Sequence, residues 1–105
     1  MTRRTVRVDQ QFFTELDAQL GETRGPHEEP SASDFLLIEL PTIAETFGER
    51  FDELLRLYPE RDDYRYLVAG GRLVYAVVVV GQLVDDETIS LFGIEIDLHG
   101  PRAAR

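Results

Sequence analysis

The sequence contains no cysteine and no lysine, because all eleven of its basic residues are arginines. The absence of cysteine excludes disulfide bonds, thiolate nucleophiles and zinc sites with cysteine ligands. Long apolar runs are absent too, since the longest uninterrupted one, residues 76–80, is far shorter than the ~20 residues of a membrane-spanning helix. With no basic and then apolar leader at the N-terminus, the sequence predicts a cytoplasmic protein.

Acidic residues dominate the charge, and twenty of them against eleven arginines give a formal net charge of −9. The charge is unevenly spread: residues 1–8 carry three arginines and no acid, whereas residues 9–63 carry fifteen acids and four arginines. Such a chain repels the phosphates of nucleic acids and the surface of an anionic membrane. We therefore expect a protein partner that carries basic groups, and neither a membrane nor a nucleic acid.

Length and composition predict one domain. The 105 residues, 43% of them hydrophobic and 30% charged, suffice for one core between two packed layers but not for two domains. We expect this domain to span residues 1–98. Residues 99–105, which include a glycine, a proline and two alanines, are expected to form a flexible tail.

Local patterns predict a strand and a helix near the N-terminus. Residues 5–8 alternate valine with polar side chains, as a short edge strand does. Asp9 is a suitable N-cap for a helix over residues 10–20, whose apolar positions recur along one face. The polar stretch over residues 22–32 contains glycine and proline and predicts a solvated connector.

Residues 35–40 allow two interpretations: a separate strand, or the start of one helix over residues 34–58 that is kinked at Pro41. Apolar residues keep one helical phase across the proline, which an unrelated strand would have no reason to do. We therefore favour the kinked helix. The residues of this stripe are Leu36, Leu40, Ile43, Phe47, Phe51, Leu54 and Tyr58.

The opposite face of the predicted kinked helix is acidic. A surface of this charge suits a basic protein partner. The acidic residues of the face are Glu39, Glu45, Glu49, Asp52 and Glu53. Our candidate binding residues are the last four, Glu45, Glu49, Asp52 and Glu53.

The last forty residues are typical of strands. Residues 64–69 and 72–80 flank Gly70–Gly71, which predicts a hairpin with a two-residue turn. The stretch 72–80 is apolar on both faces from Leu73 onward, so we expect a central strand that is covered on both sides. Residues 81–87 are predicted as the next connection, before a long strand over residues 88–98.

This order of elements predicts an α+β fold. Helices grouped on one side of an antiparallel sheet form a two-layer sandwich. The expected architecture is a short N-terminal strand and two helices, the second kinked at Pro41, packed on a C-terminal antiparallel β-meander.

Glu95, Asp97 and His99 stand at alternate positions, so they share one face if the last strand extends that far. Same-face neighbours on a strand lie roughly 6.5–7 Å apart, which lets adjacent members share a divalent metal ion, as in a metal-dependent hydrolase. The alternative is the polar, solvated end of an edge strand. We favour this alternative because no second acidic cluster is placed to complete a metal site, and we expect no cofactor.

Arg65 and Arg72 lie on predicted strands close to Tyr64, Tyr66 and Tyr75. Arginine beside tyrosines on a sheet suits phosphate positioning and base stacking. The favoured alternative for Arg72 is a salt bridge to the carboxylates near the end of the last strand. No nucleophilic constellation accompanies these arginines, since none of the serines lies in a glycine-flanked elbow.

The order strand, helix, helix and three strands resembles the RelE/ParE superfamily of bacterial toxins, in which a helical hairpin packs on an antiparallel sheet. The run Gly70-Gly71-Arg72-Leu73-Val74-Tyr75 resembles the family's Gly-x-Arg-Leu-Val-Tyr opening of the central strand. The stretch over residues 54–59, Leu-Leu-Arg-Leu-Tyr-Pro, is similar to the end of the family's second helix.

The resemblance implies either an active toxin or a binding domain of the same fold. An active toxin would be a gyrase inhibitor or a ribosome-dependent messenger-RNA endonuclease, with Arg72, Arg65 and Tyr75 as its site residues. Ribonuclease members carry basic residues on the last strand, where this chain has Glu95 and Asp97. We therefore expect a non-catalytic protein-binding domain, whose partner is an antitoxin-like peptide or a second copy in a homodimer.

Overall fold

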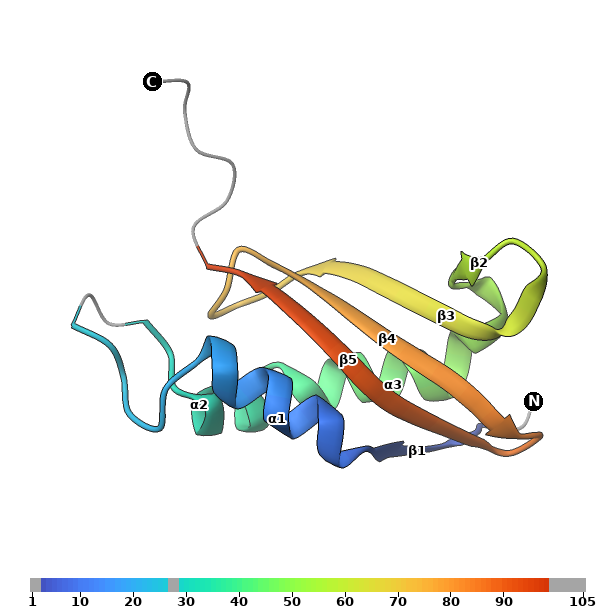
Figure 1. The fold of residues 1–105 in the computed structure, drawn as a ribbon, viewed down its shortest axis with the longest axis horizontal. Coiled ribbons are helices and arrows are strands. Elements are labelled where there is room, and N and C mark those ends of the chain that lie inside the picture. The colour runs from blue at the N-terminus through green and yellow to red at the C-terminus, as the bar shows by residue number, and fades with distance from the viewer. Residues whose placement is uncertain (1–2, 27–28, 99–105) are drawn as a thin grey trace, which may run out of the picture.

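The computed structural model describes residues 3–26 and 29–98, so the predicted tail over residues 99–105 lies outside the described part. It confirms the α+β fold and gives five strands in the order β1-β5-β4-β3-β2, with β1 parallel to β5 and the other neighbours antiparallel (Figure 1). The elements are β1 (Thr5–Val8), α1 (Gln10–Gln19), α2 (Ala32–Ile38), α3 (Leu40–Arg50), a 3₁₀ turn (Phe51–Glu53), β2 (Leu55–Tyr58), β3 (Arg61–Gly70), β4 (Ala76–Asp85) and β5 (Thr88–Asp97).

The three α-helices pack on one face of the sheet, and the core lies between the two layers (Figure 1). Phe12 and Leu16 of α1 and Phe47 of α3 are fully buried there, against Val79 and Leu91 of the sheet. Burying a side chain of this size contributes roughly 1.5–3 kcal/mol, so this layer supplies most of the stability. No helix within residues 3–26 and 29–98 is both long and apolar enough to span a membrane.

The predictions for β1 and α1 are confirmed. The carboxylate of Asp9 accepts a hydrogen bond from the amide of Gln11 at 2.9 Å, as an N-cap does. The helix ends at Gln19, with Leu20 as its C-cap. Local signals were sufficient here because the cap and the apolar stripe both belong to the helix itself.

Side chains of α1 close part of one sheet edge. β1 pairs with β5 only over residues 88–91. Beyond that point, Glu15 accepts a hydrogen bond from the amide of Ile94 at 3.0 Å. Gln19 accepts one from the amide of Ile96 at 2.7 Å and donates one to the carbonyl of Ile94 at 2.8 Å. These two side chains take the bonds that a longer β1 would make.

The helix predicted over residues 34–58 is confirmed as far as Arg50, in two parts. The break lies at Glu39, which ends α2 and precedes α3, and Pro41 lies in the first turn of α3. Because proline has no amide hydrogen, it cannot donate to the carbonyl of Leu37, and the first helix ends there. Residues 35–38 are therefore helical, and the strand alternative for this segment is wrong.

The prediction that the helix continues over residues 51–58 is wrong, because these residues form the 3₁₀ turn and β2. The cause is a contact from a distant strand. Arg65 of β3 donates hydrogen bonds to the carbonyls of Asp52 at 3.1 Å and Leu54 at 2.8 Å. In a continued helix these carbonyls would accept from amides four residues later. The guanidinium therefore replaces the helical bonds.

The two-residue turn predicted at Gly70–Gly71 is also wrong, since the connection between β3 and β4 covers residues 71–75. The carboxylate of Glu39, itself buried, accepts hydrogen bonds from the amides of Leu73 at 2.6 Å and Val74 at 3.3 Å. Val74 is drawn into the core by this anchor. Residues 72–75 are consequently a folded loop and do not extend the strand.

Most of the connection predicted over residues 81–87 belongs to β4, which continues to Asp85. Gly81 lies inside the strand because α3 approaches the sheet closely at this point. A Cβ atom on Gly81 would lie 2.8 Å from Cε1 of Phe47, closer than side chains normally pack. The glycine is thus required by helix packing and does not mark a turn.

We predict that Gln19→Ala destabilises the fold by about 1–2 kcal/mol, because it removes two hydrogen bonds to the edge of β5. Gln10→Ala, at the exposed start of the same helix, is the matched control. Urea denaturation measures the stability of both variants, and hydrogen exchange follows the amide of Ile96. Equal stability of the two variants, with unchanged exchange at Ile96, would contradict this role.

Candidate functional site

The face of the sheet turned away from the helices carries a cluster of apolar and aromatic side chains. The register places Tyr66 beside Val80 and Val68 beside Val78, out of phase with Val79, which is buried under the helices. The residues of this surface, called the aromatic face below, are Leu55, Tyr58, Tyr64, Tyr66, Val68, Val78, Val80 and Phe92.

No described element covers the aromatic face (Figure 1). The prediction that the central strand is covered on both sides is therefore wrong for the described residues. Leu55 is 57% exposed, Tyr58 49% and Val68 55%. An exposed apolar surface that spans several strands is typical of an interaction site.

Three rings of the aromatic face pack edge to face. The ring centres of Tyr58 and Tyr64 lie 5.3 Å apart, and those of Tyr64 and Phe92 lie 6.0 Å apart. The guanidinium of Arg61 lies 4.9 Å from the centre of the Tyr64 ring and is bound to Asp63 at 2.7 Å. The hydrogen bond from Arg61 lowers the pKa of the Asp63 carboxyl below its ordinary value. This pair keeps the arginine on the rings and offsets its charge.

Arg65 lies on the other face of β3 and is buried. Besides the carbonyls of Asp52 and Leu54, its guanidinium binds the carbonyl of Asp62 at 3.0 Å and lies 5.6 Å from the centre of the Phe51 ring. These contacts use its donors within the fold. Arg65 is thus placed to hold the end of α3, away from any substrate.

Arg72 and Tyr75 lie in the connection over residues 71–75, and both are exposed. The register sets Ala76 opposite Asp97, so Arg72 stands at the same end of the sheet as the carboxylate that was its expected partner. Among the described residues, however, no ion pair involves Arg72.

The structure does not bring Arg65 together with Arg72 and Tyr75. Gly70, the last residue of β3, is five positions along the strand from Arg65, a distance of roughly 17 Å. Arg65 also points under the helices. These residues cannot act as one compact site in this arrangement.

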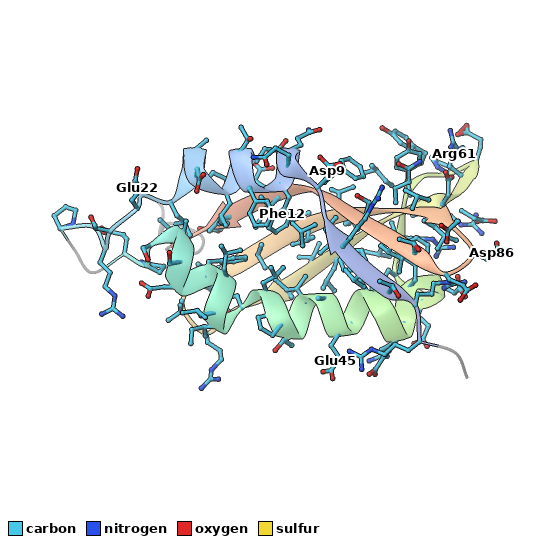
Figure 2. All side chains as sticks on the ribbon, turned by 90° about the horizontal axis from the view of Figure 1, so that it is seen from below. Asp9, Phe12, Glu22, Glu45, Arg61 and Asp86 are labelled. Carbon is cyan, nitrogen blue, oxygen red and sulfur yellow. The ribbon has the colours of Figure 1, made fainter. Side chains whose placement is uncertain are left out.

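Most carboxylates of the predicted acidic face form ion pairs with arginines of the same chain. Of the four candidate binding residues, only Glu45 makes no ion pair among residues 3–26 and 29–98. It points outward from α3 (Figure 2). The observed pairs are Arg3 with Glu49 at 3.3 Å, Arg4 with Asp52 at 3.5 Å and Arg50 with Glu53 at 3.1 Å.

Three of these carboxylates, Glu49, Asp52 and Glu53, border a cleft of about 570 Å³ between the end of α3 and the turn that joins β4 to β5. Arg4 lines this cleft: its Nε donates to the carbonyl of Asp86 at 3.1 Å, and its guanidinium lies 5.7 Å from the centre of the Phe51 ring. The chain's own arginines therefore already pair with all three of these carboxylates.

The candidate metal site receives no support from the geometry. Within the described residues, no three histidine, aspartate or glutamate side chains lie close enough together to hold a metal ion. Glu95 and Asp97 are both exposed, beside Val78 and Ala76 of β4. His99, the third predicted member, lies outside the described residues.

A scan against protein-family models and searches of curated proteins and of solved structures found no match for this chain. The chemistry of its surfaces is therefore the basis for a functional proposal.

Sequence patterns did not place Tyr58 and Phe92 on one face of the sheet. The predicted helix over residues 34–58 included Tyr58. Phe92 joins this face only because the pairing of β4 with β5 shifts register between Val80 and Gly81. One signal was present: residues 76–80 are apolar at every position, although the helices predicted from the sequence were expected on one side of the sheet only.

We predict that Arg65→Met lowers the free energy of unfolding by about 3 kcal/mol, because it leaves the carbonyls of Asp52 and Leu54 without their donor. The matched control is Arg56→Met, which removes an exposed arginine paired with Asp62 at 2.9 Å and should cost less than ~1 kcal/mol. Urea denaturation measures both. Losses of similar size would show that Arg65 does not hold the end of α3.

Proposed function

We propose that this chain is a non-catalytic protein-binding domain of RelE/ParE-like fold, acting in the bacterial cytoplasm as part of a toxin–antitoxin-type system. The observation that carries the proposal is the aromatic face, which no element among the described residues covers (Figure 1). Its rings are fixed by mutual contacts, so binding orders few side chains and loses little conformational entropy.

The chain's arginines support binding over catalysis. Arg65 is buried among carbonyls, Arg61 is paired with Asp63, and Arg4 with Asp52. Phosphoryl chemistry on RNA needs several basic groups free to face the substrate, and general acid–base catalysis needs a group within hydrogen-bond reach of the reacting atom. A net charge of −9 opposes RNA binding further.

Leucine substitutions on the two sides of the molecule test the proposal. Leu55 of the aromatic face and Leu37 of α2 are both exposed, so aspartate at either position should leave the fold intact. The wild type, Leu55→Asp and Leu37→Asp are each co-expressed with the genes that flank this one and are crosslinked in cells.

We expect Leu55→Asp to lose the crosslinked protein partner by about tenfold, because a carboxylate buried in an apolar interface costs more than 1.4 kcal/mol. Leu37→Asp should retain it. The crosslinked products are quantified by mass spectrometry. Equal recovery from all three chains, or no partner with the wild type, would refute the proposal.

A second candidate is an active toxin, favoured by one observation: Arg72 and Tyr75 are exposed together in the connection that Glu39 anchors. Such an anchored loop can present both side chains to gyrase or to the ribosome. Growth of a bacterial host after induction distinguishes the two candidates. A binding domain leaves growth unchanged, whereas a toxin arrests it and Arg72→Ala restores it.

A further inference from the structure

The outer edge of β3 is only partly paired. β2 covers its first part, and the last matched pair is Leu55 with Tyr66. Residues 67–70 pair with β4 on their inner side and have no strand on their outer side. Within the described part of the chain, no side chain bonds to the outward backbone groups of these four residues either.

This open edge contrasts with the edge of β5, which Glu15 and Gln19 close with three hydrogen bonds. Proteins usually protect edge strands with charges, prolines or covering side chains, because an unpaired edge accepts strands from other chains. Residues 67–70 read Leu-Val-Ala-Gly and contain none of these devices. Among the described residues, the unpaired part of β5 is protected and residues 67–70 of β3 are left open.

A narrow groove runs beside the open edge on the helix side. Thr42 and Thr46 of α3 face Leu67 and Ala69 of β3 across a space of about 90 Å³. On the other side, Val68 belongs to the aromatic face and is 55% exposed. A strand added here would direct alternate side chains into the groove and onto the aromatic face, because successive residues of a strand point to opposite sides.

We propose that residues 67–70 bind an extended segment of a separate protein as a sixth strand, and that this segment alternates apolar with basic side chains. The inference rests on the proposed function and names the kind of partner. Backbone hydrogen bonds along the edge supply affinity, while the groove and the net charge of −9 select the side chains.

A second copy of this chain fits the edge less well. It would bring another −9 of net charge to the contact. Its own β2 would also restrict pairing to the same four residues, because β2 already occupies the edge before Leu67. A flexible segment has no such restriction, since residues on either side of the paired stretch can lie over the aromatic face.

Three synthetic peptides test the occupant: an acetylated peptide that alternates valine with arginine, the same peptide with glutamate for arginine, and the first peptide with a central proline. Binding to the full chain is measured by calorimetry and amide hydrogen exchange. We expect the arginine peptide to bind and to protect outward amides within residues 67–70. The glutamate and proline peptides should bind about tenfold more weakly, through charge repulsion and a lost backbone donor respectively.

A matched pair of threonine substitutions tests the groove. Thr46 donates its hydroxyl to the carbonyl of Thr42 at 3.0 Å, and Thr14 of α1 makes the same bond to Gln10 at 3.2 Å. Arginine at position 46 places a positive charge in the groove, so Thr46→Arg should lower the affinity for the arginine peptide by about tenfold. Thr14→Arg should leave its affinity unchanged.

Unprotected amides at residues 67–70, or equal affinity for the three peptides, would overturn the inference. So would a wild-type dimer in light scattering that Thr46→Arg dissociates, because the occupant would then be a second copy. These outcomes concern the edge of β3 alone. The proposed function is tested separately, by whether Leu55→Asp loses the crosslinked protein partner. A partner that depends on Leu55 but leaves residues 67–70 exchanging freely would refute the edge alone.

Discussion

The hydrogen bonds from Arg65 to the carbonyls of Asp52 and Leu54 determine where α3 ends, and the shape of the sheet depends on that point. If α3 continued, the residues of β2 would be helical and β3 would have no outer neighbour. The ring of Phe51 contacts two guanidinium groups in the same place, those of Arg4 and Arg65, each less than 6 Å from its centre. One buried arginine thus connects the helix layer, β2 and β3.

The use of arginine in internal contacts also explains the surface of the molecule. Arg4, Arg61 and Arg65 each combine an aromatic ring with an acceptor from the chain itself. Arginine suits this role because its planar group stacks on rings while donating in several directions. With these cations committed to the fold, the exterior keeps the excess of carboxylates, and the aromatic face is an apolar area bordered by charges such as Arg61, Asp63 and Glu95.

Elements whose signals are local could be predicted from the sequence, such as α1 with its Asp9 cap and the position of β5, although not which side each β5 residue faces. The errors occurred where a residue distant in sequence decides the outcome. Arg65 ends α3 from 11 residues beyond Leu54, and Glu39 shapes the loop at Leu73 from 34 residues before it. The aromatic face could not be assembled from the pattern either, because Phe92 reaches Tyr64 only through a shift in register.

The closure of β5 by α1 limits how many further strands can add to the sheet. A polymer of β-sheets needs two open edges on each unit, so that every added chain offers a new place for the next. Here Glu15 and Gln19 occupy the unpaired part of β5, and β1 is only four residues long and carries Arg7. Within the described residues, the unpaired part of β5 is thus unavailable to a further strand, so the proposed contact at residues 67–70 of β3 would favour a finite complex over a fibre.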